Sequence, residues 1–332
     1  MPVLTVTKGL PGSGKTTWAT EDLTRDGNSV RVNRDDLRAM LHRGMKWSYG
    51  REKFTKRVQT VAVRAMLESG VNVIVDDTNL LGSGTDRWKT FIDELNRERL
   101  AKDQGSKPHS FEVKDFTDMP LSECVKRDML RKPPAQVGRG VIERMALESG
   151  LIDLSVHSRV AVFDIDGTLA NLDHRLEFVQ KEPKDWNTFF DRVGSDDLFQ
   201  TVAVFLRILR LTHTIILLSG RTSDTGGATN EWMHRNNIKS NYLFMRRSND
   251  RRPDVEVKQE LLDRMFAAGL QKSSIKIMFD DRPAVCDMWR SHSLPLVQVD
   301  HGAVIAVEPS AAELFGVCEP LALEAQRCTA KP

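Results

Sequence analysis

Cysteine is scarce in this sequence, with only four residues among 332, and none of them lies in a Cys-x-x-Cys or mixed Cys/His pattern. This spacing excludes a structural zinc site and predicts a reducing compartment. No apolar run approaches the roughly 20 residues that a membrane-spanning helix needs, and the N-terminus has no signal-peptide pattern. We therefore expect a cytoplasmic protein without a membrane partner.

An excess of charge of one sign is also missing, because 48 lysines and arginines are balanced by 46 aspartates and glutamates, for a formal net charge of +2. Any anionic partner must then be held by local clusters of basic side chains and not by the field of the whole molecule. Composition alone neither excludes nor predicts nucleic acid as that partner. The length suits two domains of ordinary size.

Short apolar runs alternate with helical patterns along the chain. This rhythm predicts an α/β fold of two domains, each a parallel sheet flanked by helices. The expected strands cover residues 2–6, 29–32, 71–75, 159–163, 214–218, 275–279 and 296–299. Because periodicity is lost near 150–158, we place the domains at 1–152 and 153–304, with an accessory or partly disordered tail at 305–332.

A helix is predicted over residues 51–69, before Gly70. Its apolar positions recur at helical spacing, which indicates the face that covers the sheet. The residues expected on that buried face are Phe54, Val58, Val61, Ala65 and Met66.

Residues 9–16, GLPGSGKT, match the phosphate-binding pattern G-x-x-x-x-G-K-[ST] in full. Glycines let successive backbone N–H groups face the phosphates, Lys15 reaches the β- and γ-oxygens, and the Thr16 hydroxyl can ligate magnesium. A strand before this P-loop and a helix after it fit the same purpose. The pattern predicts a site for ATP and Mg²⁺ made by Gly9, Gly12, Ser13, Gly14, Lys15, Thr16 and Thr17.

Acidic residues follow the next two expected strands, at the edge where open α/β sheets bind their ligands. Asp35 or Asp36 can accept the proton of an acceptor hydroxyl while Arg38 binds a phosphate, although an aspartate here can equally cap the next helix. Asp76 and Asp77 can act on a metal or its waters, or lie in a solvated turn.

Two arginines in "CVKRDMLRK", Arg127 and Arg131, stand four residues apart, so we expect them on one side of a helix. In kinases of the nucleoside-kinase type such a pair lies on a lid over the phosphates. A solvated helix face is the alternative.

The stretch "VFDIDGTL" at 162–169 ends an expected buried strand with two aspartates one residue apart. It resembles motif I of the haloacid dehalogenase superfamily of phosphohydrolases. In this arrangement Asp164 attacks phosphorus, Asp166 protonates the leaving oxygen and later deprotonates water, and Gly167 permits the tight turn.

The remaining parts of such a site follow in order along the chain. Ser219 directly follows the apolar run of the expected strand 214–218 and can bind a phosphate oxygen, with Arg221 close by. Lys258 can offset the charge of the nucleophile and the phosphoryl group. Asp280 and Asp281 supply hard oxygen ligands suited to Mg²⁺.

About fifty residues separate the first two of these motifs, and a core helix is expected from Leu198 to Leu209. The preceding aromatic residues can form a small cap that stacks on bases, or belong to the core. They are Phe178, Trp186, Phe189 and Phe190. A local basic concentration offers one path for nucleic acid, through Arg175, Arg246, Arg247, Arg251 and Arg252.

Seven stretches in order make roughly residues 1–300 resemble the phage-type bifunctional polynucleotide 5'-kinase and 3'-phosphatase family. They are GLPGSGKTTW, VNRDDLR, DDTNL, VKRDMLR, FDIDGTLA, SGR and FDDR. The resemblance implies an end-healing enzyme that phosphorylates 5'-hydroxyl ends and removes 3'-phosphates from DNA or RNA, with ATP and Mg²⁺. It also implies work with a nucleic-acid ligase, a homo-oligomer, and a host cytoplasm if the chain is phage-encoded.

The resemblance also implies a role for each site residue. Lys15 and Thr16 would bind ATP and magnesium, Asp35 would be the base in preference to Asp36, and Arg38 and Asp77 would contact the acceptor. Arg127 and Arg131 would bind the ATP phosphates, with Arg131 stabilising the group in transfer. In the second domain, Asp164 would be the nucleophile and Asp166 the acid and base. Arg175, Arg221 and Asp254 would contact the substrate, and Ser219 and Lys258 would bind its phosphate. The Mg²⁺ ion would be held by Asp164, Asp166, Asp280 and Asp281.

Two other functions stay open at this point. One is a P-loop kinase for a hydroxymethylated base or a small metabolite, joined to a general phosphomonoesterase. The other is a nucleotide-gated binding module without turnover, although complete catalytic motifs in both halves argue against it.

Overall fold

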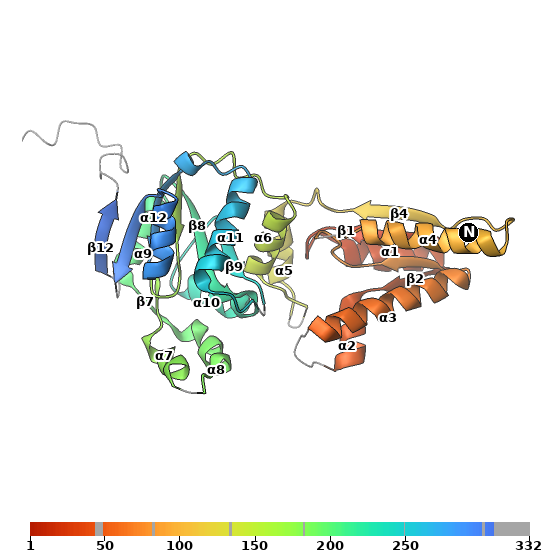
Figure 1. Ribbon diagram of the computed structural model, residues 1–332, viewed down its shortest axis with the longest axis horizontal. Helices are drawn as coiled ribbons and strands as arrows, with labels where there is room; N and C mark the ends of the chain where they lie inside the picture. The colour runs from red at the N-terminus through yellow and green to blue at the C-terminus, as the bar shows by residue number, and fades with distance from the viewer. Residues whose placement is uncertain are drawn as a thin grey trace, which may run out of the picture. The chain divides into compact units, whose positions relative to one another are not determined.

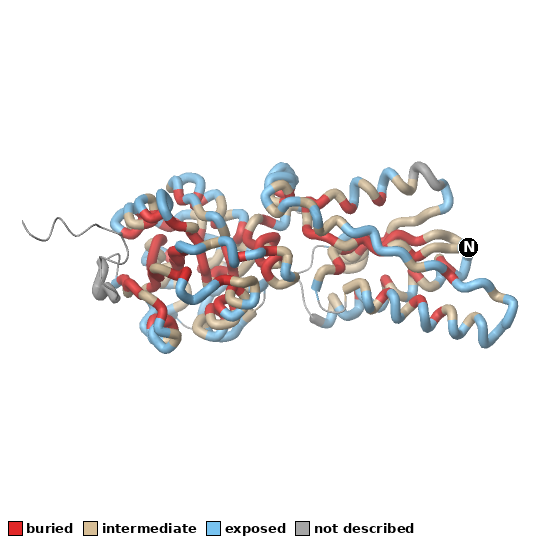
Figure 2. The backbone as a smooth tube through the Cα atoms, turned by 90° about the horizontal axis from the view of Figure 1, so that it is seen from above, coloured by how far each residue is buried: buried red, intermediate tan, exposed pale blue. Residues whose placement is uncertain are grey.

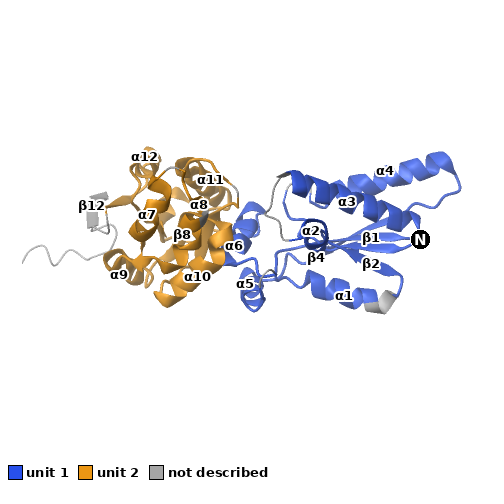
Figure 3. Cartoon of the chain, turned by 90° about the horizontal axis from the view of Figure 1, so that it is seen from below, with its two compact units in different colours: residues 1–151 blue, residues 152–332 orange. Residues whose placement is uncertain are grey.

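The computed structural model describes residues 1–43, 49–81, 84–132, 135–181, 183–248, 250–300 and 303–308. The chain divides into two compact units, residues 1–151 and 152–332, and each is described here by itself (Figure 3). Both have a parallel or largely parallel sheet flanked by helices, which confirms the predicted fold class (Figure 1). Within the described ranges, no helix combines the length and the apolar character needed to cross a membrane.

The first unit is built on a parallel sheet in the order β2-β3-β1-β4. β1 (Val3–Lys8), β2 (Ser29–Val32) and β3 (Asn72–Val75) lie where the apolar runs predict them. β4 (Ser110–Asp115) is not among the expected strands, because this edge strand is mostly exposed and has no continuous apolar run.

Helices cover both faces of this sheet (Figure 3). α3 (Tyr49–Glu68) and α4 (Asp86–Lys102) lie on one face, and α1 (Lys15–Asp26) lies on the other. The remaining helices are α2 (Arg34–His42), α5 (Leu121–Met129) and α6 (Arg139–Glu148). The core between the sheet and α3 and α4 consists of Leu4, Val6, Val32, Val63, Leu67, Val73, Val75, Trp88, Ile92 and Leu95.

The helix predicted at 51–69 is α3, but its predicted buried face is wrong. Phe54 is 53% exposed and Val61 is 61% exposed. The buried positions recur every four residues instead, and they are Thr55, Gln59, Val63 and Leu67. Two of these four residues are polar. A prediction that counts only apolar residues therefore assigns the buried face to the wrong side of the helix.

The second unit has a sheet in the order β12-β11-β10-β5-β8-β9, parallel except for β12. β5 (Val160–Phe163), β10 (Ile275–Asp280) and β11 (Leu296–Asp300) match predicted strands. β8 (Thr214–Thr222) is longer than predicted, so Ser219 and Arg221 lie within it and not beyond its end. β9 (Tyr242–Arg246) is a further strand that the sequence analysis does not anticipate.

α9 (Gln200–Leu209) and α10 (Gly226–Arg235) lie on one face of this sheet, and α11 (Asp254–Ala267) and α12 (Pro283–Ser291) lie on the other (Figure 3). α9 confirms the core helix expected at 198–209. Buried residues concentrate on the strands and the inward faces of these helices (Figure 2). Short 3₁₀ turns occur at Val193–Ser195, Ser223–Thr225 and Lys272–Ser274.

An insertion between β5 and α9 begins and ends in a small antiparallel pair, β6 (Ala170–Asn171) with β7 (Asp197–Leu198). It carries α7 (Asp173–Gln180) and α8 (Trp186–Asp191), which contain the predicted cap aromatics. The paired ends return the chain close to its starting point, so residues from both ends of the insertion can reach one site.

The C-terminal boundary differs from the prediction. β12 (Ala303–Glu308) pairs antiparallel with β11 and runs across residue 304, where we placed the end of the second domain. The predicted tail beyond residue 308 lies outside the described residues.

Candidate active sites

The P-loop joins β1 to α1, and its glycines hold conformations that other residues avoid. Gly12 has φ +83° and Gly14 has φ +103°, and a Cβ atom at Gly12 would collide with the carbonyl oxygen of Cys124. The first residue of the loop, Gly9, donates its backbone N–H to the carbonyl of Thr78, 3.0 Å away. The loop is therefore tied to the segment that follows β3.

Lys15 is the first residue of α1, and its side chain folds back onto its own loop. Its Nζ donates to the carbonyl of Leu10 at 2.6 Å and to Oγ of Ser13 at 3.3 Å. Burial lowers the pKa of Lys15 to about 8, although the Asp76 carboxylate opposes this shift. A buried ammonium with so little compensation is well suited to an anionic ligand such as a nucleotide phosphate.

Asp35 lies in the first turn of α2 and carries the most exposed carboxylate of this region, with 90% of its side chain accessible. Its oxygen forms an ion pair with Arg38 on the next turn. The helix is capped by Asn33, which accepts from the backbone N–H of Asp36 at 2.7 Å. The capping interpretation is therefore wrong for both aspartates, and the Asp35 carboxylate is exposed to solvent beside Arg38.

Glu52 on α3 is a residue that the sequence analysis does not identify. It accepts from Nε of Arg38 at 2.8 Å and from Nη1 of Arg34 at 3.1 Å. Burial raises the pKa of Glu52, but the two guanidinium groups outweigh it and hold that pKa below its ordinary value. One carboxylate thus orients two arginines beside Asp35.

Asp76 and Asp77 are both buried after β3, so the solvated-turn interpretation is wrong. Asp77 accepts from Nε of Arg34 at 2.9 Å and from the amide of Gln59 at 2.9 Å. Asp76 accepts from Arg31 at 2.7 Å through one oxygen. Its other oxygen, Oδ1, is buried and has no hydrogen-bond partner among the described residues, as expected of a group that serves a ligand.

Only one arginine of the predicted pair lies in a helix. Arg127 lies in α5, donates to Glu123 at 2.8 Å, and has its Nη1 within 3.8 Å of the position a Gly14 Cβ would take. Arg131 lies beyond the end of α5, so the expectation that both arginines share one helix face is wrong. Its charge still acts on Lys15 and lowers the pKa of that lysine, so both arginines lie near the P-loop.

In the second unit, Lys258 lies at the centre of three carboxylates. Its Nζ lies 2.8 Å from Asp280, 3.0 Å from Asp164 and 3.5 Å from Asp254. The side chain is fully buried, and although burial lowers its pKa, the three carboxylates outweigh that effect and raise it well above the ordinary value. Lys258 is a permanent cation at this site.

The carboxylates of Asp164, Asp280 and Asp281 approach each other closely enough to bind one metal ion, with ligand oxygens within 4.8 Å. Burial raises the pKa of Asp164 well above its ordinary value, because one ammonium does not offset the neighbouring carboxylates. Burial and Asp280 raise the pKa of Asp281 to about 6. A divalent cation such as Mg²⁺ would relieve this repulsion, so the donor set fits the predicted metal.

Gly167 is required where Asp281 approaches the first motif. Its φ is +85°, and a Cβ atom there would collide with the Asp281 carboxylate. The turn after Asp166 therefore lets the two predicted motifs meet.

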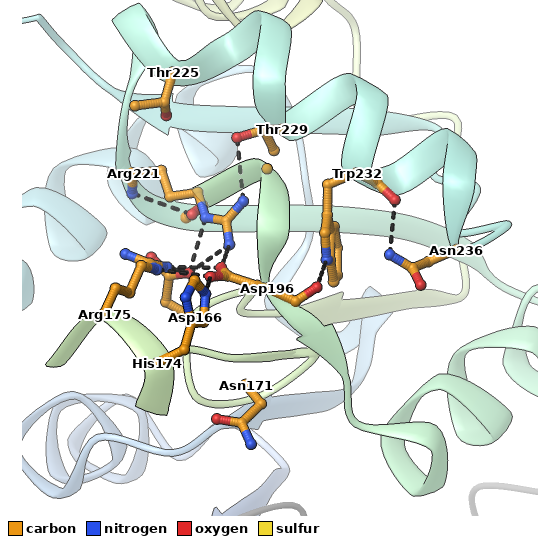
Figure 4. Close-up of polar contacts among 12 residues, drawn as sticks. Asp166, Asn171, His174, Arg175, Asp196, Arg221, Thr225, Thr229, Trp232 and Asn236 are labelled. Carbon is orange, nitrogen blue, oxygen red and sulfur yellow. Dashed lines mark hydrogen bonds and ion pairs between the residues drawn. The ribbon is translucent and has the colours of Figure 1, made fainter. Parts of the chain in front are cut away.

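Asp166 lies in a different environment, beside Arg175 and Arg221 (Figure 4). Among the described residues, its carboxylate is not part of the group that could hold the metal ion. Its Oδ1 accepts from Arg175 at 2.7 Å and from Nε and Nη2 of Arg221 at 2.8 and 2.7 Å. Burial opposes ionisation, yet the two arginines keep the pKa of Asp166 below its ordinary value. Asp166 is therefore a carboxylate in the free protein.

Asp196 completes this network and is another residue that the sequence analysis does not identify (Figure 4). Its fully buried carboxylate accepts from Nε of Arg175 at 2.7 Å and from Nη2 of Arg221 at 2.5 Å. His174 lies 2.8 Å from the same carboxylate, and the backbone carbonyl of Asp196 accepts from Trp232. Asp196 holds the two arginines beside Asp166 from the far end of the insertion.

Ser219 is fully buried and accepts from the backbone N–H of Arg221 at 3.1 Å. Asp254 begins α11 and accepts from Arg246 at 2.9 Å. Burial raises its pKa, but Lys258 and two arginines outweigh this and lower it. Much of the predicted basic concentration is paired with acids in the same way, since Arg252 binds Asp250 at 2.7 Å and Glu260 at 2.5 Å.

The aromatic residues of the insertion have both of the predicted environments. Phe189 is buried and its ring lies 4.3 Å from the guanidinium carbon of Arg175. Trp186 is 50% exposed and stacks on Phe190, with ring centroids 6.0 Å apart. The inner aromatic supports a site arginine and the outer one stays accessible.

Comparison with known proteins agrees with the division of the chain into two units. Residues 158–304 match the family model of the polynucleotide kinase PNKP phosphatase domain, and residues 4–146 match the model of the AAA domain. The second unit is thus similar to a polynucleotide kinase phosphatase domain, and the first unit, which holds the P-loop, is similar to an AAA domain. The resemblance inferred from the seven motifs is thereby confirmed.

A curated relative carries both polynucleotide kinase and ligase in its name. It is named a bifunctional polynucleotide kinase/RNA ligase, from Autographa californica nuclear polyhedrosis virus, and is 25% identical over an alignment of 318 residues that covers 89% of this chain and 42% of the viral protein. The chain thus spans less than half of that relative's length.

Similar solved structures include a chain of a Pnkp1/Rnl/Hen1 complex and an APS kinase. The first is 28% identical, covers 90% of this chain and 96% of its own, and has a TM-score of 0.37. The second, the APS kinase CysC of Mycobacterium tuberculosis, is 23% identical, covers 38% of this chain and 68% of its own, and has a TM-score of 0.27.

Proposed function

We propose that this chain is a bifunctional end-healing enzyme. Its first unit transfers the γ-phosphate of ATP to the 5'-hydroxyl of a DNA or RNA strand, and its second unit hydrolyses a 3'-phosphate. The observation that carries the proposal is the cluster of Asp164, Lys258, Asp280 and Asp281 in a domain of the polynucleotide kinase phosphatase family. The P-loop and Asp35 in the same chain supply the opposite reaction.

In the kinase unit, Asp35 takes the proton of the 5'-hydroxyl while Arg38 holds a phosphate of the acceptor strand. Residues 9–17 bind the ATP phosphates, and Arg127 and Arg131 neutralise charge on the group in transfer. The exposure of Asp35 supports this role, because a base for an external strand end must be reachable. Mg²⁺, held by Thr16, would offset charge on the phosphates.

In the phosphatase unit, Asp164 attacks phosphorus, the bond from phosphorus to the 3'-oxygen breaks, and Asp166 gives that oxygen a proton. Water then loses a proton to Asp166 and displaces inorganic phosphate from Asp164. Ser219 and Lys258 hold the phosphoryl oxygens, and Asp164, Asp280 and Asp281 would hold Mg²⁺, which neutralises phosphate charge.

Asp166 must be protonated for the first of these steps, although the pKa of Asp166 is low in the free protein. Its low pKa is due to Arg221 and Arg175, which outweigh the effect of burial. A 3'-phosphate that binds the same guanidinium groups would offset their charge and raise that pKa. Substrate binding thus prepares the acid.

The relative that is named as a kinase and RNA ligase supports a further part of the proposal, namely that a nucleic-acid ligase seals the healed ends. The cytoplasm is the proposed location, because the described cysteines, Cys124 and Cys286, are free thiols. A homo-oligomer stays a prediction.

The test uses one oligonucleotide with a 5'-hydroxyl and a 3'-phosphate, incubated with and without ATP and Mg²⁺ and then weighed. We expect an ATP-dependent gain of one phosphate at the 5' end and an ATP-independent loss of one at the 3' end. Asp164→Asn abolishes only the loss and Lys15→Ala abolishes only the gain. Unchanged mass at both ends contradicts the proposal, and turnover of a small metabolite in place of the oligonucleotide favours the alternative kinase.

A further inference from the structure

A cationic cavity lies beside the predicted acceptor site of the first unit. It has a volume of about 270 Å³ and is bordered by the side chains of Arg34, Lys56 and Arg87. Thr78 and Gly84, from the segment that joins β3 to α4, also border it. We call it the Arg87 pocket.

Two of the three cations form no ion pair with a described carboxylate. Among the described residues, Arg87 and Lys56 have no carboxylate within 4.0 Å, and Arg87 donates only to the amide oxygen of Gln59, at 3.1 Å. Burial and the neighbouring Arg34 lower the pKa of Arg87. Arg87 also lies in the first turn of α4, where the helix dipole disfavours a cation. An anion in the pocket would stabilise the charge of Arg87 against its burial, the repulsion from Arg34 and the helix dipole.

The third cation connects the pocket to the catalytic residues. Arg34 shares the Oε1 atom of Glu52 with Arg38, at 3.1 and 3.2 Å, and Arg38 pairs with Asp35. On the other side, Thr78 accepts from Gly9 at the start of the P-loop. The Arg87 pocket is therefore adjacent to the proposed base and to the proposed ATP site.

We propose that the Arg87 pocket binds a backbone phosphate of the acceptor strand, one nucleotide further from the 5' end than the phosphate held by Arg38. The inference rests on the proposed kinase function and deepens it. A phosphodiester carries one negative charge and several acceptor oxygens, which match an arginine and a lysine that lack carboxylate partners. Each phosphate held in this way contributes to affinity without reading sequence.

The first experiment compares acceptors that differ by phosphates. Arg87→Gln is measured with a 5'-hydroxyl trinucleotide and with a nucleoside 3'-monophosphate, which has only the phosphate assigned to Arg38. We expect KM for the trinucleotide to rise about tenfold, far more than KM for the monophosphate, with the salt dependence of binding reduced by about one ion. Arg97→Gln is the matched control, because Arg97 is exposed on the same helix and borders no part of the pocket.

The second experiment removes the charge from the ligand. A trinucleotide whose second phosphate is a neutral methylphosphonate should bind the unaltered protein about tenfold more weakly. Combined with Arg87→Gln it should lose little more, because each change removes the same interaction. Independent, additive losses overturn the assignment.

Direct binding of the trinucleotides, measured by calorimetry without ATP, separates this proposal from the function on which it rests. If the protein binds the trinucleotide with Arg87-dependent affinity but transfers no phosphate, the kinase proposal fails and the pocket stands. If it phosphorylates the trinucleotide but Arg87→Gln and the methylphosphonate leave KM and affinity unchanged, the pocket proposal fails alone. If no trinucleotide binds, both fail.

Discussion

The two candidate sites hold similar charged residues in opposite surroundings. In the first unit, Asp35 is almost fully exposed and Lys15 is a buried ammonium with little compensation, whose pKa falls to about 8. In the second unit, Asp164 and Lys258 are both buried, and three carboxylates raise the pKa of Lys258. In the proposed kinase site the lysine depends on a ligand to balance its charge, whereas in the proposed phosphatase site the protein's own carboxylates balance the lysine.

The largest expected effect comes from neutralising the two lysines. Lys258→Met removes the ammonium from the buried carboxylates of Asp164, Asp254 and Asp280, and of these Asp254 keeps arginine partners. We therefore expect loss of phosphatase activity and a decrease of about 3–5 kcal/mol in the stability of the second unit. Lys15→Met removes an ammonium that is already costly to bury, so kinase activity is lost while stability changes by less than about 1 kcal/mol. Urea unfolding followed by tryptophan fluorescence measures both. Equal destabilisation by the two substitutions would break the comparison.

The second effect concerns the network around Asp166. Asp196→Asn weakens the ion pairs that hold Arg175 and Arg221, while the volume of the side chain stays nearly the same. We therefore expect phosphatase kcat to fall about 100-fold. The pH profile should change as well, because burial raises the pKa of Asp166 and Arg221 and Arg175 are what hold that pKa below its ordinary value. Kinase activity is the internal reference, and Asp197→Asn, an exposed neighbour, is the matched control. An equal loss from Asp197→Asn would show that the insertion matters only as a scaffold.

The third effect is a pH dependence in the kinase unit alone. Lys15 binds phosphates in its charged form, and the pKa of Lys15 in the free protein is about 8. Above that pH the lysine loses its proton, so kcat/KM for ATP should fall by about tenfold per pH unit. Bound nucleotide restores the charge, so kcat should fall less. Initial rates between pH 7 and pH 10 test this, and a flat kcat/KM profile would contradict it.

The smallest effect compares two helix caps. Asn33→Ala removes the cap of α2 and Asp185→Ala removes the cap of α8, each at about 1 kcal/mol. Only α2 carries a proposed catalytic base, so Asn33→Ala should also lower kinase activity a few-fold, whereas Asp185→Ala should leave it unchanged. Thermal unfolding and initial rates, taken together, decide the outcome.

The sequence predicts those parts of the fold that are marked by continuous apolar runs. The strands at 29–32, 159–163 and 275–279 appear within a residue of their predicted bounds. β4 could not be found in this way, because an exposed edge strand buries too little to need apolar residues. The face of α3 is misplaced because buried Thr55 and Gln59 serve polar partners.

Motif residues could be found from local patterns, but their partners could not. Asp164 and Lys15 belong to short motifs with a stated chemistry. Glu52 and Asp196 belong to no motif, and each acts on arginines that are distant along the chain, up to 25 residues for Asp196 and Arg221. Their importance depends on tertiary packing, which spacing alone does not show.

The hydrogen bond from Trp289 to Asp280 has a practical consequence. The indole N–H of this buried residue lies 3.1 Å from a carboxylate of the proposed magnesium group, and Trp232 is bonded in the same way to the backbone of Asp196. Two of the six tryptophans are thus hydrogen-bonded to the phosphatase site, one to the proposed magnesium ligands and one to the network around Asp166. The protein contains its own optical probes, and their emission can follow the occupancy of that site without any label.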